Sequence, residues 1–328
     1  MPDVQHIFYN SLSLPVVAAP MFLISGPKLV TTCCRSGIIG TLPALNQRSS
    51  EGFDQWLTDI ENDLNSFENE TGRKPAPYGV NLIVHRTNPR LQADLDICVK
   101  HQVPIVITSL GAVSDLVKKV HGYGGLVFHD VTNRRHSEKA MEAGVDGLIL
   151  VSAGAGGHAG LLNPMPFIQE IRSFFDGIIL LSGCMSNGGD VASAMQMGAD
   201  LAYLGTRFIN TDESRADDDY KHMIMESKTS DIVYTAAVSG VHANFLRPSL
   251  EAMGITQELW GIKKKIDFGS ELDAQKAEAK AWKTIWSAGQ GVATINTESS
   301  PVEELVRNMK NEFHEAIDRQ LAFKTKFA

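Results

Sequence analysis

Eight short apolar runs, separated by helical patterns, follow one another along the chain up to residue 208. Several are rich in Val and Ile and lack strict alternation, which is typical of strands buried on both faces of a parallel sheet. They span residues 16–21, 38–45, 78–84, 104–110, 126–131, 147–153, 177–183 and 201–208. Eight strand-and-helix units favour a closed barrel over an open doubly wound sheet, which usually needs fewer strands. We therefore predict an α/β fold, a (β/α)8 TIM barrel.

The segments between these runs have the periodicity and end signals of helices. Residues 133–143 and 189–197 each lead to a glycine, Gly144 or Gly198, that suits a helix C-terminus. A wider gap between the second and third runs contains the acidic amphipathic segment 51–70. This pattern predicts an outer helix with a solvated face.

The alternation stops after about residue 214, and the rest of the chain is helix-rich. It includes the charged segment 271–283 and a closing helix over 302–323. We predict a barrel over 1–214, a helical substrate or lid region over 215–300 above the barrel mouth, and a C-terminal helix over 301–328 that packs back on the barrel. A wholly independent second domain is the alternative for the later part.

Composition limits the kinds of partner. A net charge of −8 over 328 residues, with only short basic clusters, argues against a general nucleic-acid binder. The N-terminus lacks the basic and apolar regions of a secretory signal, and no apolar stretch approaches a membrane span. Cys33, Cys34, Cys98 and Cys184 have no C-x-x-C spacing, which predicts reduced thiols and no zinc ribbon. We expect a cytoplasmic protein without membrane or nucleic-acid partners and without a metal site, and a homodimer remains open.

In this type of barrel the active site lies where the strands end, so the residues after each strand matter most. The loop 153–160 (AGAGGHAG) has almost no side chains until His158. Glycines allow the backbone to approach a planar or charged ligand closely, and histidine titrates near neutral pH. We predict that this loop lines a ligand and that His158 is an acid, a base or an electrostatic anchor.

Glycine turns follow the seventh and eighth predicted strands. The sequences are Ser182-Gly183-Cys184 and Tyr203-Leu204-Gly205-Thr206. Paired turns at these two places are the usual phosphate site of the fold, where backbone N–H groups receive the anion. The pattern predicts a phosphorylated cofactor.

Six segments in this order resemble the nitronate monooxygenase (2-nitropropane dioxygenase) family, from about residue 15 to 310. They are Ala18-Ala19-Pro20-Met21, Val80-Asn81-Leu82, Ala155-Gly156-Gly157-His158-Ala159-Gly160, Ser182-Gly183-Cys184-Met185, Leu204-Gly205-Thr206 and Ala288-Gly289-Gln290-Gly291. The Gly-Gly-His-x-Gly loop is the most specific of them. The resemblance implies an enzyme, an FMN-dependent oxidoreductase that holds its cofactor non-covalently. Its implied reaction oxidises a small-molecule alkyl nitronate with O2 to a carbonyl compound and nitrite.

The resemblance also implies roles for individual residues. His158 matches the catalytic histidine of the family, and Met21 would pack against the flavin or limit the substrate pocket. The implied cofactor-binding residues are Ala19, Pro20, Met21, Asn81, Gly156, Gly157, Ser182, Gly183, Cys184, Tyr203, Leu204, Gly205 and Thr206. Two positions depart from the family pattern: Cys184 replaces the usual second glycine of the phosphate turn, and Val151 stands where a glutamine is common.

Alternatives remain open. Residues 206–214 (TRFINTDES) resemble flavin-dependent quinone and enoyl-thioester reductases of the same superfamily, so an NAD(P)H-dependent flavin reductase is the second interpretation. A non-catalytic barrel that binds a phosphate ligand, such as a sensor or storage protein for flavin, is the third. His85, Arg86, His129 and His242 could also reach the pocket. His129 is the first choice among them, although a hydrogen-bonded structural role is favoured for each.

Overall fold

Eight parallel strands close into a barrel in chain order, with β9 pairing to β1. The computed structural model describes residues 11–85, 87–111, 113–238, 240–262 and 284–327. The barrel strands are β1 (Val16–Ala18), β2 (Ile39–Pro43), β3 (Tyr78–Ile83), β4 (Ile105–Ser109), β5 (Leu126–Val131), β6 (Gly147–Val151), β8 (Ile178–Ser182) and β9 (Leu201–Leu204). Each lies within one of the eight predicted runs, which confirms the (β/α)8 barrel.

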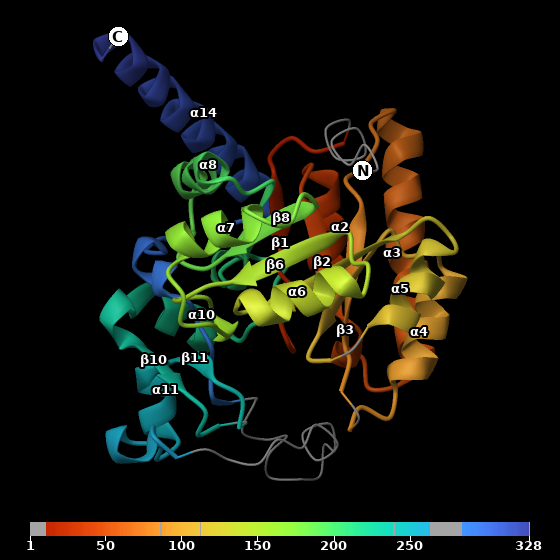
Figure 1. The fold of residues 1–328 in the computed structure, drawn as a ribbon, viewed down its shortest axis with the longest axis horizontal. Coiled ribbons are helices and arrows are strands. Elements are labelled where there is room, and N and C mark those ends of the chain that lie inside the picture. The colour runs from red at the N-terminus through yellow and green to blue at the C-terminus, as the bar shows by residue number, and fades with distance from the viewer. Residues whose placement is uncertain (1–10, 86, 112, 239, 263–283, 328) are drawn as a thin grey trace.

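Helices surround the barrel as an outer layer (Figure 1). They are α2 (Pro27–Arg35), α3 (Ser50–Thr71), α4 (Leu91–Lys100), α5 (Ser114–His121), α6 (Arg134–Glu142), α7 (Pro164–Arg172), α8 (Gly188–Met197) and the short α9 (Thr206–Ile209). The Ser49 side chain accepts a hydrogen bond from the Gly52 N–H and so caps α3, and Asn187 caps α8. The predicted helices over 51–70, 133–143 and 189–197 are confirmed.

Two apolar layers hold these elements together, one inside the barrel and one between the barrel and the helices. Side chains alternate between them along each strand. In β6, Leu148 and Leu150 belong to the outer layer, whereas Ile149 and Val151 belong to the barrel interior. The interior is therefore a packed core and not a pore.

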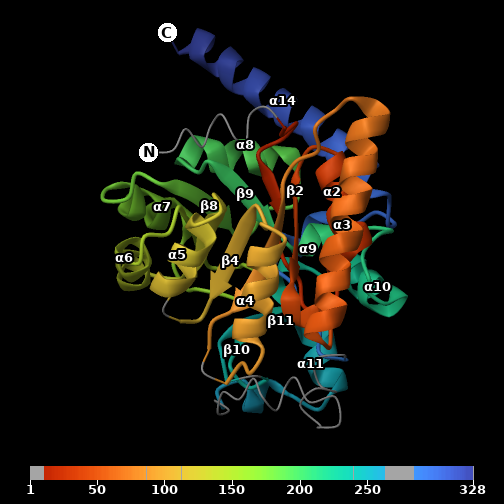
Figure 2. The same cartoon turned by 90° about the vertical axis from the view of Figure 1, so that its right-hand side faces the viewer.

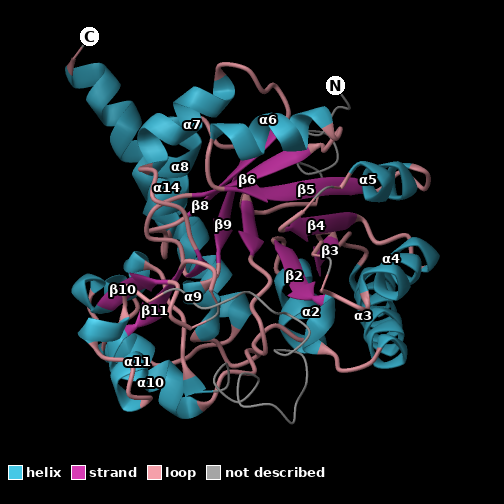
Figure 3. Ribbon diagram, turned by 60° about the horizontal axis from the view of Figure 1, so that its bottom comes forward, coloured by secondary structure: helices cyan, strands magenta, loops and turns pink. Residues whose placement is uncertain are grey.

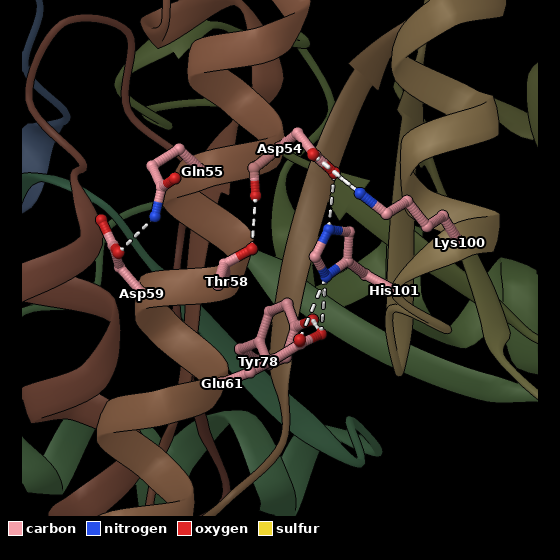
Figure 4. A network of polar contacts seen from close by, with 8 residues as sticks. All are labelled: Asp54, Gln55, Thr58, Asp59, Glu61, Tyr78, Lys100 and His101. Carbon is pink, nitrogen blue, oxygen red and sulfur yellow. Dashed lines mark hydrogen bonds and ion pairs between the residues drawn. The ribbon is translucent and has the colours of Figure 1, made fainter.

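A polar network joins α3 to the end of α4 (Figure 4). The His101 ring lies between two carboxylates of α3, with Nε2 2.7 Å from Asp54 Oδ1 and Nδ1 3.0 Å from Glu61 Oε2. Lys100 contacts Asp54 at 2.7 Å, and this hydrogen bond, followed by that of His101, lowers the pKa of Asp54. The Tyr78 hydroxyl of β3 donates to Glu61 at 3.0 Å. These contacts fix the outer helices against the barrel wall on the side shown in Figure 2.

The part of the chain after the barrel is not entirely helical. It contains α10 (Asp218–Glu226), β10 (Ile232–Thr235), β11 (Ala243–Leu246) and α11 (Arg247–Ala252), with short 3-10 turns at Thr229–Asp231, Gln257–Leu259 and Gln290–Thr294. A further 3-10 turn, Ala44–Asn46, follows β2 in the barrel. β11 pairs antiparallel with β10 and with β7 (Gly157–His158), a strand in the loop after β6. The sequence predicts only helices here, because strands this short give no clear alternation. The predicted charged segment 271–283 lies outside the described residues.

The last helix, α14 (Val302–Lys326), begins against the barrel and extends away from it at its C-terminal end (Figure 1). Val302, Leu305, Val306 and Met309 are buried in the outer apolar layer. Contact with α8 is close, since a Cβ added at Gly188 would lie 1.9 Å from the Met309 carbonyl oxygen. None of the described helices combines the length and the apolar character that a membrane crossing needs.

Candidate active site

A cavity of about 580 Å³ lies at the C-terminal ends of the barrel strands, a size suited to a cofactor or small ligand. Figure 3 shows the barrel strands from this direction, with the small sheet of β10 and β11 beside them. Every residue that the sequence singles out for the site lines this cavity: Ala19, Pro20, Met21, Asn81, Gly156, Gly157, His158, Ser182, Gly183, Cys184, Tyr203, Leu204, Gly205 and Thr206. Residues up to 187 positions apart in the chain thus meet at one place.

Polar side chains of neighbouring strands form the floor of the cavity. Asn81 of β3 donates from Nδ2 to Ser109 Oγ of β4 at 2.9 Å, and Ser109 Oγ donates to Asp130 Oδ2 of β5 at 2.5 Å. Ser182 and Tyr203 lie side by side across β8 and β9. One layer deeper the barrel interior is apolar, with Ile107, Phe128, Ile149 and Leu180 among its residues. The floor of the cavity is therefore a layer of polar side chains above the apolar core of the barrel.

Asp130, like Ser109, belongs to this floor but is not among the residues predicted from the sequence. Burial raises its pKa to about 6, although the hydrogen bond from Ser109 acts in the opposite direction. Its second oxygen, Oδ1, is buried and has no hydrogen-bond partner among the described residues. Alternation along β5 places Asp130 on the same face as Leu126 and Phe128, which is a signal only once the inward face of this strand is known.

His129, the first choice among the additional pocket residues, is not part of the cavity lining. Its Nδ1 lies 2.7 Å from Thr108 Oγ1, and burial lowers its pKa to about 4. His85 pairs with Thr87 at 2.9 Å, and the His242 ring stacks on Tyr234 with 4.9 Å between centroids. The hydrogen-bonded role favoured for these histidines is thus observed for His129 and His85, and His242 is packed against an aromatic ring. Arg86 lies outside the described residues.

His158 is held by a strand and not by a free loop. It is paired with Ala243 of β11, and the Ala159 N–H donates to the His242 carbonyl at 3.3 Å. Asn244 donates from Nδ2 to the Ala155 carbonyl at 2.7 Å and so anchors the glycine-rich segment. The His158 Nε2 atom is buried without a partner among the described residues, and burial lowers the pKa of the imidazole. The site therefore favours a neutral ring with one unused nitrogen.

The two glycine turns differ in the room they leave. At Gly183, φ is +124° and an added Cβ would lie 2.5 Å from Ser152 Oγ, so backbone conformation and space both require glycine. An added Cβ at Gly205 would meet nothing nearer than Met21 Sδ at 3.7 Å. Gly205 lines the cavity, and a Cβ there would make ordinary van der Waals contacts without a clash.

Cys184 occupies a backbone conformation that glycine adopts more easily, with φ at +61°. This explains why a glycine is common at the position in the family that the sequence resembles. The thiol lies 3.4 Å from the Ala153 carbonyl oxygen, and burial raises its pKa. Cys184 is part of the cavity lining, as predicted.

Residues after the barrel cover the cavity. The Tyr220 and Trp286 rings stack with 4.9 Å between centroids and an angle of 6°, and both line the cavity. Gly289 donates its N–H to Thr206 Oγ1 at 2.9 Å, and Gln290 donates to the Gly154 carbonyl at 2.9 Å. These bonds tie the cover to the Gly205 turn and to the glycine-rich loop after β6. Arg48 and Arg215 also belong to the lining, and the described residues contain no cluster that could hold a metal ion.

Comparison with known proteins gives a consistent result. Residues 44–312 match the nitronate monooxygenase family. A nitronate monooxygenase of Paraburkholderia phytofirmans is 25% identical, with 94% of each chain covered. FabK of Thermotoga maritima has a similar fold, with a TM-score of 0.79, 21% identity and 98% of each chain covered. A nitroalkane oxidase of Streptomyces ansochromogenes has a TM-score of 0.78 and 22% identity, over 96% of this chain and 99% of that one.

Proposed function

Because the chain belongs to the nitronate monooxygenase family, a family of flavin-dependent oxidoreductases, we propose that it binds FMN and oxidises alkyl nitronates with O2. The products are a carbonyl compound and nitrite. The observation that carries this proposal is the shared cavity, in which the unpartnered Nε2 of His158 and the glycine turns at Gly183 and Gly205 lie around one ligand-sized volume.

The residues present fit a flavin mononucleotide. Gly205 leaves space where a side chain would otherwise project, and the neighbouring Gly183 turn offers backbone N–H groups for a phosphate. Asn81 and Tyr203 belong to the polar floor on which a heteroaromatic ring would rest. The covering Tyr220 and Trp286 would limit the access of water from the other side. The bound flavin would supply the electron-transfer chemistry, and the protein would supply orientation and proton handling.

His158 is proposed as the base for carbon acids that still carry their proton. Burial lowers the pKa of this imidazole, so the neutral form is favoured at neutral pH. A neutral Nε2 without a partner can accept a proton from the carbon next to a nitro group. The alternative role, a protonated anchor for the nitronate anion, needs a charge in a buried position that has no carboxylate within hydrogen-bond distance in the described structure. We therefore favour the base.

The test begins with the absorbance spectrum of the purified protein and of protein incubated with FMN. A flavin spectrum, bleached by alkyl nitronate without O2 and restored by O2 with formation of nitrite, is the expected result. Protein that remains colourless after incubation with FMN would contradict the flavin proposal. Protein that binds FMN but is not bleached by nitronates would contradict the substrate and leave the cofactor in place.

An NAD(P)H-dependent flavin reductase acting on a quinone or an enoyl thioester is the second candidate. The observation that favours it is the pair of cations, Arg48 and Arg215, in the cavity lining, where they could receive the phosphates of a nucleotide or of a thioester carrier. Anaerobic mixing with NADH separates the two functions. Rapid bleaching by NADH favours the reductase, whereas bleaching by nitronate alone favours the monooxygenase.

A further inference from the structure

We infer that Asp130 is a ligand-binding residue in the floor of the cavity, where its free carboxylate oxygen accepts a hydrogen bond from the ring N–H of the bound flavin. This inference rests on the proposed function, because it assigns a partner inside the proposed flavin site. Asp130 lines the same cavity as Asn81 and His158.

The orientation of the carboxylate is fixed by its neighbours. Ser109 has one hydroxyl proton, which it gives to Asp130 Oδ2, while it accepts from Asn81 Nδ2. Asn81 uses its second N–H toward the Ile107 carbonyl at 3.5 Å. The remaining oxygen, Oδ1, is buried and lacks a partner among the described residues. Among the described residues, Asp130 Oδ1 is therefore an acceptor left without a donor in the cavity floor.

The charged and titratable groups around Asp130 do not compensate this carboxylate. The next interior residue on β6 is Val151, and Tyr203 approaches from β9 as a neutral phenol whose pKa is raised by burial and then by Asp130. His129 of the same strand bonds to Thr108 in the other layer. Among the described residues, Asp130 forms no ion pair with Lys, Arg or His. A ligand that covers the floor must bring a donor or force a proton onto the carboxyl.

A flavin ring can bring such a donor. In its oxidised form the isoalloxazine carries a single ring N–H, at N3, between two carbonyl groups, and a carboxylate oxygen is the stronger type of acceptor for it. Hydrogen bonding from Ser109 favours the ionised carboxylate, which is the form that accepts. An anionic substrate group is repelled from the same oxygen, so the inference places a nitronate on the His158 side of the cavity.

The inference gives a definite pH dependence. Burial holds the pKa of Asp130 at about 6 in the free protein, and a donor on Oδ1 lowers it in the complex. Flavin affinity should therefore strengthen as pH rises through 6. FMN is a poor first probe because its phosphate also titrates near that pH. Riboflavin carries the same ring without the phosphate.

The experiment measures riboflavin dissociation constants between pH 5 and 7.5 for wild type and Asp130→Asn, which keeps the side-chain volume and removes the titration. The wild-type constant should fall on the order of tenfold across this range, and that of the variant should stay level. Ser109→Ala removes the bond that favours ionisation, so its midpoint should move to higher pH. Riboflavin methylated at N3 lacks the donor and should lose the wild-type pH dependence.

Three outcomes overturn the inference. The first is the same pH dependence of the riboflavin dissociation constant in wild type and Asp130→Asn. The second is riboflavin affinity that strengthens as pH falls in wild type alone. The third is a pH dependence of wild-type binding that is unchanged with the N3-methylated ring. If riboflavin binds too weakly, the FMN dissociation constants of wild type and Asp130→Asn are compared instead. The titration of the phosphate affects both proteins equally. Failure of both proteins to bind any flavin overturns the proposed function together with the inference, whereas binding that ignores Asp130 overturns the inference alone.

Discussion

His129 and Asp130 are adjacent in β5, but their side chains lie on opposite faces of the barrel wall. His129 bonds to Thr108 in the layer under the helices, and Asp130 bonds to Ser109 at the cavity floor. Burial disfavours the charged form of each, which lowers the pKa of His129 to about 4 and raises that of Asp130 to about 6. The two neighbours therefore affect stability in opposite directions over nearly the same pH range.

Asp130→Asn should stabilise the flavin-free protein at neutral pH. The folded state of wild type binds the Asp130 proton more tightly than the unfolded state, whose pKa is about 3.9. The contribution of protonated Asp130 to the free energy of unfolding is complete below about pH 3.9 and is lost as pH rises through 6. We expect a gain in the free energy of unfolding on the order of 2 kcal/mol at pH 7.5, shrinking toward zero near pH 4. Urea unfolding at several pH values measures it, and a gain that does not vary with pH would contradict the assignment.

His129→Asn should make the protein less sensitive to acid. The pKa of His129 is lowered in the folded state. The contribution of its neutral ring to the free energy of unfolding is therefore complete above about pH 6.5 and is lost as pH falls toward 4. The variant is expected to be less stable than wild type at pH 7.5, because imidazole packing is lost. The difference in the free energy of unfolding between variant and wild type should shrink by about 2 kcal/mol between pH 7.5 and pH 4.5. A constant difference across the same urea series would show that His129 does not titrate in this range.

His158→Asn should affect chemistry and leave binding intact. The pairing of residue 158 with Ala243 uses only backbone, so bound FMN and thermal stability should remain near wild type. Reduction of the flavin by a neutral nitroalkane should slow on the order of 10²-fold or more, because the positioned base is lost. Preformed nitronate, which needs no deprotonation, is the control substrate and should suffer far less. Equal losses for both substrates would favour the anchor role, and no loss would remove His158 from the mechanism.

Gly205→Val should cost FMN affinity with little loss of stability. A Cβ at residue 205 would lie 3.7 Å from Met21 Sδ without a clash, and Gly205 lines the cavity, so the valine methyl groups should occupy the volume assigned to the cofactor. We expect at least a tenfold weaker dissociation constant and a nearly unchanged melting temperature for the flavin-free protein. Gly183→Ala is the comparison, because its φ of +124° and the 2.5 Å contact with Ser152 should lower stability as well. Full flavin retention in Gly205→Val after dialysis would show that the phosphate lies elsewhere.

Gly188→Ala should loosen the last helix. The added methyl group would lie 1.9 Å from the Met309 carbonyl oxygen, so α14 must shift away from α8. The expected cost is about 1–3 kcal/mol in the free energy of unfolding, with faster proteolysis after residue 300. The matched control is Gly189→Ala, where the nearest atom is Asn187 Oδ1 at 3.2 Å. Similar losses in both variants would point to helix propensity and not to the contact with Met309.

The sequence predicts the barrel and most of the cavity lining because both depend on local signals. A run of eight buried strands leaves few other folds, and glycine turns mark the strand ends that carry the site. The pair His129 and Asp130 shows the limit of such signals. When a strand is buried on both faces, apolar residues occur at every position, and the phase that decides which polar neighbour points inward is hidden. The sequence therefore names His129 as an additional candidate, with a hydrogen-bonded structural role favoured, and does not name Asp130, which lines the cavity.

The cover of the cavity was harder to predict for a different physical reason. β7 is 2 residues long and pairs with β11, which lies more than 80 positions later in the sequence. Pairing at that distance is decided by tertiary packing and leaves no periodic pattern. The stacked Tyr220 and Trp286 are also brought together only by the fold.

The pairing of His158 with β11 determines which part of the molecule carries the proposed base. His158 is held by the small sheet outside the barrel, because it pairs with Ala243 of β11 and the Asn244 side chain bonds to the preceding glycine-rich segment. The glycine turns belong to the barrel itself. The position of the proposed base is therefore set by the packing of the small sheet, whereas the glycine turns keep the geometry of the barrel.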